Sequence, residues 1–255
     1  MATRRQHLGV LCWPEQYCVR VVVGRLPSYV TPDHLTAVAI GGALVAGLAL
    51  VGCRVSGWFV PLVCLGLIAN WFGDSLDGAL ARNRHIERHR VGFLIDHTAD
   101  VVSLAVIILA LGLSPYLTLD AALMLLVAYL VHAVYALMRT VVDGVQIIGM
   151  GGIGATEGRI FIGVWVATIQ IGRLSFASFP TSNIDVFNMA AAALLVVWFA
   201  VFVRRVALDV SRIGSLEQAA RPLHRASQGY DNALLIVQGD KTSFASPSKG
   251  TLEHA

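Results

Sequence analysis

Six stretches of the sequence are apolar over about the length that a helix needs to cross a bilayer, roughly 20 residues. Of the 255 residues, 56% are hydrophobic and only 14% are charged, whereas a soluble domain carries about a quarter charged residues. This composition excludes a soluble enzyme and predicts an all-α, polytopic membrane protein with about six transmembrane helices. The expected spans are 36–55, 57–81, 93–113, 116–139, 157–178 and 185–206.

Arginines gather next to alternate connections between these spans. They precede the first span, crowd the connection around residues 83–91 and follow the last span, whereas the connections 114–119 and 179–184 contain no Lys or Arg. Cytoplasmic loops of membrane proteins are enriched in positive residues. We therefore predict an integral membrane protein with both termini in the cytoplasm. The net charge of +3 is concentrated at the ends of spans, which favours a lipid surface and no nucleic acid partner.

Two flanking segments differ from the membrane domain, which we place at residues 36–210. Residues 1–35 form a cytoplasmic arm, in which valines alternate with Arg20 and Arg25, as in a helix that lies in the headgroup plane. An ordinary leading loop is the alternative. Residues 211–255 are polar and contain the two lysines of the chain, so we expect a largely disordered cytoplasmic tail.

Small residues are frequent in the first span. Where lipid provides no hydrophobic drive for association, small side chains let helix backbones approach closely. We interpret these positions as a packing surface without chemistry: Ala39, Gly42, Ala43, Ala46 and Gly47.

Four carboxylates lie where a membrane protein tolerates charge least. Asp74 and Asp77 are three residues apart at the end of the second span, and Asp96 and Asp100 are four apart at the start of the third. Each pair shares one helical face, and the short connection makes the two helices antiparallel neighbours. Four such charges need counter-cations, and hard divalent ions prefer oxygen ligands. A two-metal site that binds phosphate oxygens is the simplest solution.

The residues after Asp77 favour a ligand at the same place. Gly78 and Ala81 leave little side-chain bulk on the helix, and Arg82 presents a fork of donors that suits phosphate. Each of these features also has a structural explanation: a solvated helix end, a packing patch or an arginine at the cytoplasmic surface.

Together these residues resemble the signature of the CDP-alcohol phosphotransferases (CDP-alcohol phosphatidyltransferases), which are membrane enzymes of phospholipid synthesis. The resemblance covers residues 74 to 100, and every fixed position is filled: Asp74-x2-Asp77-Gly78-x2-Ala81-Arg82, then Gly92-x3-Asp96-x3-Asp100.

The resemblance implies transfer of a substituted phosphate from a CDP-alcohol to an acceptor hydroxyl, with release of CMP. It implies two divalent cations, Mg²⁺ or Mn²⁺, held by Asp74, Asp77, Asp96 and Asp100, and it makes Asp100 the general base. It further implies a bacterial inner membrane, membrane lipids as partners, a homodimer, and a CDP pocket lined by Thr36, Gly78, Ala81 and Arg82.

The substrates stay open. Asp96-His97 is similar to the pair in choline- and ethanolamine-phosphotransferases, whereas residues 99–103 resemble phosphatidylserine synthases. The donor is therefore CDP-diacylglycerol or a CDP-aminoalcohol, and either donor or acceptor is a lipid. Glu157 and Arg159 resemble a segment of many bacterial relatives, and we expect Arg159 to contact an acceptor or lipid phosphate at the mouth of the cavity. An interfacial arginine is the alternative for Arg159.

Two other classes of protein compete with an enzyme. Intramembrane carboxylates also serve as relays in ion-coupled transporters, but the later half of this sequence has no second acidic pair. In a non-catalytic membrane scaffold, the aspartates pair with the arginines of residues 82–90.

Overall fold

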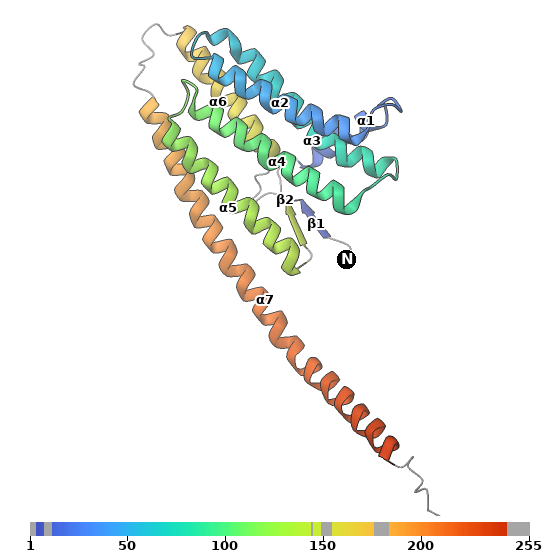
Figure 1. Ribbon diagram of the computed structural model, residues 1–255. Coiled ribbons are helices and arrows are strands. Elements are labelled where there is room, and N and C mark those ends of the chain that lie inside the picture. Colours follow the sequence, from blue (N-terminus) through green and yellow to red (C-terminus); the bar gives the residue numbers. More distant parts are fainter. Residues whose placement is uncertain (1–3, 8–11, 144, 149–154, 176–183, 244–255) are drawn as a thin grey trace, which may run out of the picture. The chain divides into compact units, whose positions relative to one another are not determined.

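The computed structural model describes residues 4–7, 12–143, 145–148, 155–175 and 184–243, and its elements are labelled in Figure 1. The chain divides into two compact units, residues 1–202 and 203–255. The helices are α1 (Cys12–Val23), α2 (Pro32–Gly52), α3 (Val60–Asn83), α4 (His89–Gly112), α5 (Leu119–Asp143), α6 (Ala155–Ser175) and α7 (Ile184–Ser243), with a 3-10 turn, η1 (Gly57–Phe59), before α3.

Five helical segments of the described residues are long and apolar enough to cross a membrane. This confirms a helical integral membrane protein and matches five of the six expected spans. The expected span 157–178 is helical as α6 up to Ser175, and residues 176–178 lie outside the described residues. Helix α6 is not among the five, because Glu157, Arg159 and other polar residues reduce its apolar character. The five segments are Pro32–Gly52, Gly57–Asn83, His89–Gly112, Leu119–Val142 and Asn188–Ala219.

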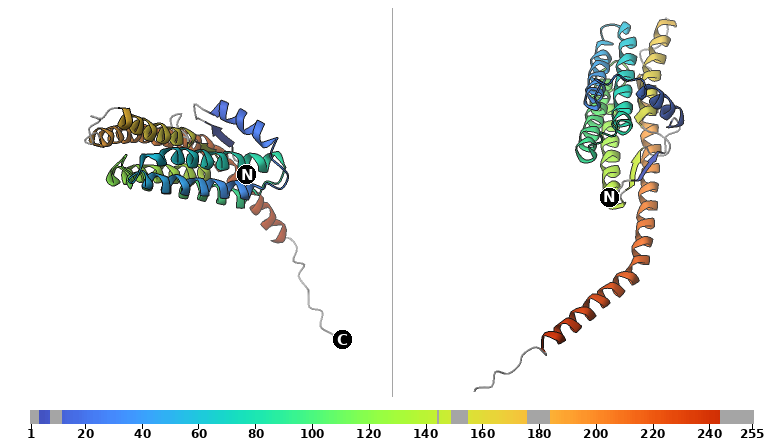
Figure 2. Two further views of the ribbon diagram at one scale, coloured as in Figure 1. Left: turned by 90° about the horizontal axis from the view of Figure 1, so that it is seen from above. Right: turned by 90° about the vertical axis from the view of Figure 1, so that its right-hand side faces the viewer.

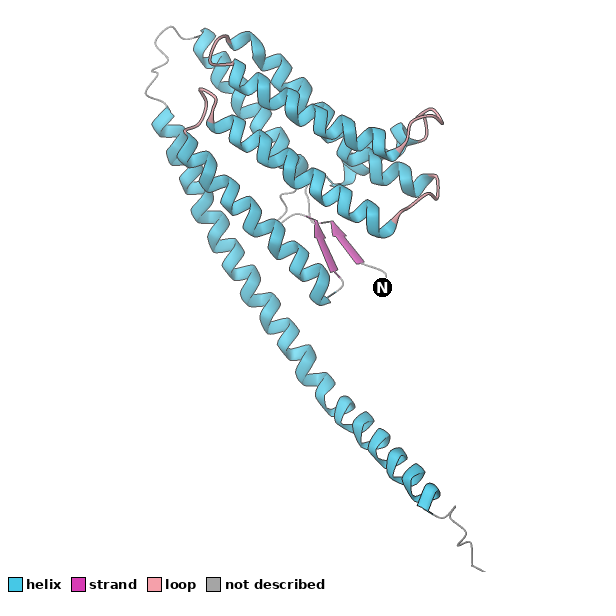
Figure 3. Cartoon of the chain, viewed as in Figure 1, coloured by secondary structure: helices cyan, strands magenta, loops and turns pink. Residues whose placement is uncertain are grey.

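A short parallel ladder accompanies the helices and was not expected from the sequence. Strand β1 (Arg4–His7) pairs with β2 (Val145–Ile148), with Arg4 opposite Val145 and His7 opposite Ile148 (Figure 3). Each strand has four residues, so the ladder joins the N-terminal arm to the segment after α5 and leaves the membrane part of the described chain helical.

Local signals set the ends of the helices around the acidic segment. Helix α2 begins with a reciprocal cap, in which Thr31 and His34 exchange side-chain-to-backbone hydrogen bonds of 3.3 Å, and Pro32 occupies the first turn. Such caps satisfy the free N–H groups of a first turn. Helix α3 ends at Asn83, and His85 follows with a φ of 56°. This turn sends the chain back along α3 as α4.

Glycines bring α2 and α3 into backbone contact. A Cβ atom on Gly66 would lie 2.8 Å from both the Gly42 oxygen and the Ala46 Cα, so only glycine fits there. The expected packing role of the small residues in the first span is confirmed for Gly42, Ala43 and Ala46, which are buried. Helix α2 also packs against α4, and the two views of Figure 2 show α2, α3 and α4 running alongside one another.

The N-terminal helix α1 packs against the end of α3 near the aspartates. Val23 of α1 forms a small buried cluster with Leu35, Leu76 and Leu80. The opposite side of α1 exposes Trp13 and Tyr17. Helix α1 therefore covers α3 with one face and leaves aromatic side chains uncovered on the other.

The second unit consists of the continuation of α7 and the residues that follow it. Helix α7 extends to Ser243, with an Arg205 Nε to Asp209 Oδ2 ion pair of 3.3 Å one turn apart. The structure thus gives helix over much of 211–255, where the sequence predicted disorder. Alanine, leucine, glutamine and arginine are frequent there, and they favour helix. Residues 244–255 lie outside the described residues.

Candidate functional site

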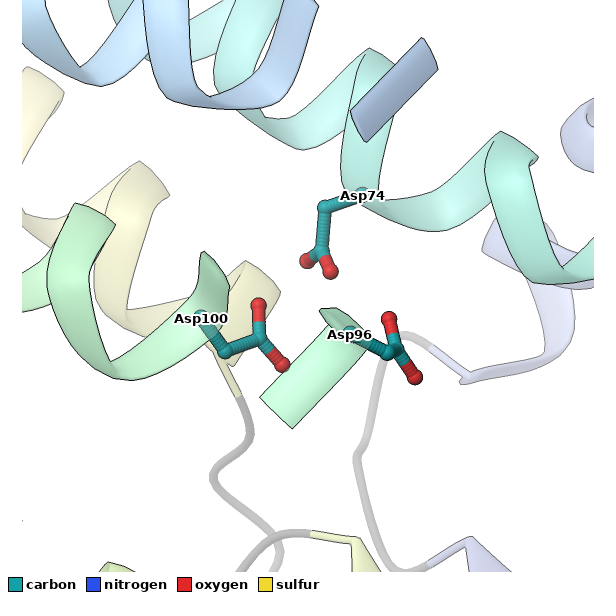
Figure 4. A group of neighbouring side chains, drawn as sticks. All are labelled: Asp74, Asp96 and Asp100. Carbon is teal, nitrogen blue, oxygen red and sulfur yellow. The ribbon is translucent and has the colours of Figure 1, made fainter. Parts of the chain in front are cut away.

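Three aspartate side chains from two helices meet at one place. Asp74 comes from α3, and Asp96 and Asp100 come from the first half of α4 (Figure 4). One carboxylate oxygen of each lies within 4.8 Å of the other two, and all three residues are partly buried. Oxygens bound to one Mg²⁺ are at most about 4.2 Å apart, because each Mg–O bond is about 2.1 Å. The three carboxylates are thus close to the spacing of ligands on one divalent cation.

The helical repeat explains why Asp77 is not in this group. Residues four apart differ by about 40° around a helix, so Asp96 and Asp100 face the same way, whereas residues three apart differ by about 60° in the other direction. Asp77 is therefore turned from Asp74 toward α2. Its Oδ2 accepts a 2.7 Å hydrogen bond from Thr36 Oγ1, and its Oδ1 accepts one of 2.5 Å from the Gly78 amide. The side chain is 6% exposed.

A buried arginine neutralises part of the acidic group. Arg159, in the first turns of α6, is 3% exposed, and its Nη2 lies 2.7 Å from Asp74 Oδ2 and 3.8 Å from Asp100 Oδ1. Its Nε donates a 2.6 Å hydrogen bond to Asn70 Oδ1. A buried charge needs both an opposite charge and hydrogen bonds, and Arg159 has both. Helix α6 is thereby tied to α3 at the acidic group.

A cavity of about 1340 Å³ opens beside Asp77 and Asp96. It is lined by residues of α1, α2, α3 and α4 and by Thr140 of α5, and basic side chains border it. The expected nucleotide contacts lie in its wall: Thr36, Gly78, Ala81 and Arg82. A Cβ atom on Gly78 would lie 3.3 Å from Arg82 Nη1, so the absence of a side chain there gives the guanidinium room. The cavity is large enough for a nucleotide-sized ligand.

Two further arginines bind residues next to this cavity: one contacts the connection between α1 and α2, and the other contacts the first turn of α2. The Arg84 guanidinium, just after α3, donates to four backbone carbonyls of residues 26–30, at 2.5 to 3.3 Å. Arg88 forms an exposed ion pair with Asp33 at the first turn of α2. Arg84 thus provides hydrogen bonds for carbonyls that lie outside the helices and strands. It also fixes the position of the segment that leads into α2 and Thr36.

Glu15 connects α1 to two other helices. Its Oε1 accepts hydrogen bonds from Trp71 Nε1 at 3.2 Å, Ser75 Oγ at 2.8 Å and Thr156 Oγ1 at 3.0 Å. Trp71 and Ser75 lie on α3 on either side of Asp74, and Thr156 begins α6. The carboxylate therefore links the N-terminal helix to both helices that carry the Asp74–Arg159 pair.

The structure brings most of the predicted site residues together, in two adjoining groups. Asp74, Asp96, Asp100 and Arg159 form one group, whereas Asp77 lies with Thr36, Gly78, Ala81 and Arg82 around the cavity. Asn70 contacts Arg159, and Glu15 contacts the residue after Asp74, but neither was among the site residues predicted from the sequence. Asn70 had a signal, since it is a polar residue inside an apolar span one turn before Asp74. Glu15 had none, because its partners are distant in sequence.

Replacing Thr36 by valine is expected to lower the free energy of unfolding by about 2 kcal/mol, because a buried carboxylate loses a hydrogen bond. The matched control is Thr140→Val, which loses only a bond to the Ala136 carbonyl of its own helix and should change stability little. Thermal unfolding in detergent measures both variants. Equal melting temperatures for the two variants would show that the bond to Asp77 contributes nothing.

A comparison of the chain with protein-family models and with curated proteins gave no match.

Proposed function

We propose that the protein is a CDP-alcohol phosphotransferase of phospholipid synthesis, which transfers a substituted phosphate from a CDP-alcohol to an acceptor hydroxyl and releases CMP. One observation carries the proposal. The aspartates of two antiparallel helices converge beside a cavity of about 1340 Å³, and the cavity wall contains the other positions of the signature, Gly78, Ala81 and Arg82. A donor nucleotide in the cavity would have its diphosphate next to the carboxylates.

The donor set fits divalent cations. Asp74, Asp96 and Asp100 offer oxygens within 4.8 Å of one another, and Asp77 is near enough to Asp96 to line the same cavity. These four side chains would hold the two proposed Mg²⁺ or Mn²⁺ ions. Bound there, the cations would neutralise the diphosphate oxygens and make the phosphorus more electrophilic.

The chain's own groups then account for the transfer step. Asp100 takes the proton of the acceptor hydroxyl, and the oxygen attacks the phosphorus distal to cytidine. The new O–P bond forms as the bond from that phosphorus to the bridging oxygen breaks, and CMP leaves with the electron pair. Arg159, beside Asp74 and Asp100, is placed to stabilise negative charge on the transferred phosphate or on the acceptor.

The membrane supplies the lipid partner in this proposal. We place both termini, α1 and the aspartates on the cytoplasmic side, because they lie next to the arginine-rich connections and cytoplasmic loops are enriched in positive residues. The bacterial inner membrane follows from the resemblance to the family. Trp13, Tyr17 and Val21 are exposed at four-residue intervals along α1, which supports a helix at the headgroup level. We count α6 as a sixth span, because its charged Arg159 faces the protein interior.

The test is CMP release by the purified full-length protein in detergent with Mg²⁺. We expect CMP from one of CDP-diacylglycerol, CDP-choline or CDP-ethanolamine, each offered separately with a panel of acceptor alcohols. Removal of divalent cations with EDTA should abolish release, and an excess of Mg²⁺ or Mn²⁺ over the chelator should restore it, because the carboxylates supply no positive charge of their own.

Two results would contradict the proposal. If folded protein releases no CMP with any substrate of the panel, a carrier or a scaffold is favoured. If CMP release persists in EDTA, the reaction does not depend on cations bound by the carboxylates. The donor that reacts also identifies which substrate carries the lipid.

A further inference from the structure

Asn70 uses both ends of its side chain inside the protein. It lies on α3 one turn before Asp74 and is 1% exposed. Its Nδ2 donates a 2.8 Å hydrogen bond to the Ala39 carbonyl of α2, and its Oδ1 accepts the 2.6 Å hydrogen bond from Arg159 Nε. A reversed amide would place its NH₂ group against the Nε–H and its oxygen against a carbonyl, so these partners fix its orientation.

The backbone contact between α2 and α3 places Asn70 there. A Cβ atom on Gly42 would lie 2.8 Å from the Gly66 oxygen and 2.9 Å from the Ala69 carbonyl carbon. Because glycine lets α3 approach this closely, the short Asn70 side chain reaches the Ala39 carbonyl and still faces α6.

Arg159 is held at one end and open at the other. The guanidinium is planar, so fixing Nε against Asn70 and Nη2 against Asp74 also fixes the direction of Nη1. Nη1 and Nη2 are both buried, and neither makes a hydrogen bond to the described residues. Nη2 contacts Asp74 as an ion pair, whereas Nη1 has no ion-pair contact with a described residue. A buried guanidinium donor without a partner is costly, and a phosphate oxygen is an acceptor that suits it.

We infer that Asn70 is a positioning residue for the proposed reaction, which fixes the Arg159 guanidinium beside Asp74 so that its free donor meets the substrate phosphate. The inference rests on the proposed function. Asp74 alone cannot fix the arginine during the reaction, because Asp74 is also a proposed ligand of the cations. The Asn70 amide is neutral and stays available to Arg159 whether or not Asp74 binds a cation.

The first test replaces Asn70 by leucine, which has a similar volume and no hydrogen-bonding group. We expect kcat/KM for CMP formation to fall by roughly ten- to a hundredfold, the range for losing one hydrogen bond to a charged group. The loss should be in kcat more than in the KM for the CDP-alcohol, because the cavity wall is unchanged. Asn188→Leu is the matched control, since Asn188 accepts bonds from Thr118 at the far end of the helices. It should keep kcat.

The second test asks whether Asn70 acts through Arg159. Lysine at position 159 keeps a positive charge but has no Nε–H in the guanidinium position, so Asn70→Leu should lower kcat little in an Arg159→Lys protein. Thermal unfolding is then measured without divalent cations for four proteins: the wild type, Asn70→Leu, Arg159→Lys and the double variant. Asn70→Leu should lower the melting temperature more in the protein with Arg159 than in the protein with lysine at that position.

The outcomes separate the two claims. An inactive wild-type protein contradicts the proposed function and with it the role of Asn70 in the reaction. The inference about Asn70 is overturned, and the proposed function stands, if the wild-type protein is active but Asn70→Leu lowers kcat and the melting temperature by the same amount whether residue 159 is arginine or lysine. That result would leave Asn70 with a structural role only, as the donor of a hydrogen bond from α3 to α2.

Discussion

Replacing Asp100 by asparagine (Asp100→Asn) is expected to lower kcat for CMP formation by about 10²- to 10⁴-fold, the contribution of a general base. Asparagine has nearly the same shape, but it cannot accept the proton of the acceptor hydroxyl. The fold should persist, because the ion pair of Arg159 with Asp74 is shorter, at 2.7 Å, than its 3.8 Å approach to Asp100. CMP release and thermal unfolding measure the two effects separately.

The matched control for this variant is Asp120→Asn. Asp120 is an exposed carboxylate in the first turn of α5, at the far end of α4 from Asp100, and its loss should leave CMP release unchanged. A scaffold predicts that neither variant changes any catalytic rate. Full activity of Asp100→Asn in folded protein would remove Asp100 from the proposed mechanism.

Gly73→Ala is expected to lower the free energy of unfolding by about 3 kcal/mol, at the upper end for overpacking. The new Cβ would lie 2.8 Å from the Ala39 Cα and closer still to backbone atoms of Leu35 and Ala39. Backbone atoms cannot rotate away, so α3 would have to move off α2. That movement would also stretch the bond between Thr36 and Asp77, one turn beyond Gly73.

The control for Gly73→Ala is the same change at Gly41, where an added Cβ meets nothing within 4 Å. Gly41→Ala should match or slightly exceed the wild-type stability, because alanine favours helix. Melting temperatures in detergent compare the two variants. If Gly73→Ala melts together with Gly41→Ala, the backbone contact between α2 and α3 is looser than its geometry implies.

The sequence predicted what depends on local pattern. Apolar length located the helices, and the four-residue spacing of Asp96 and Asp100 placed both carboxylates on one face, as the structure has them. The three-residue spacing of Asp74 and Asp77 was less informative, because a difference of about 60° around the helix turned Asp77 toward Thr36. The prediction that each pair of aspartates shares one helical face therefore did not distinguish the three-residue spacing from the four-residue spacing.

What the sequence could not predict depends on partners that are distant along the chain. The role of Asn70 depends on Arg159 of α6, which is 89 residues later in the sequence and contacts Asn70 only in the folded chain. The ladder of β1 and β2 has only four residues on each side, too few for a pattern to show. The continuation of α7 was missed for another reason, since polarity predicts disorder even where the residues favour helix.

The three hydrogen bonds of Glu15 also bear on the order in which the protein can be assembled. Glu15 leaves the ribosome early, but its partner Thr156 follows 141 residues later, and β1 must likewise wait for β2. Helix α1 therefore cannot complete its contacts until α6 has been synthesised. The N-terminal arm can pack against α3 as soon as α3 is made, but its link to α6 forms only after α2, α3, α4 and α5, the other helices that line the cavity, have been synthesised.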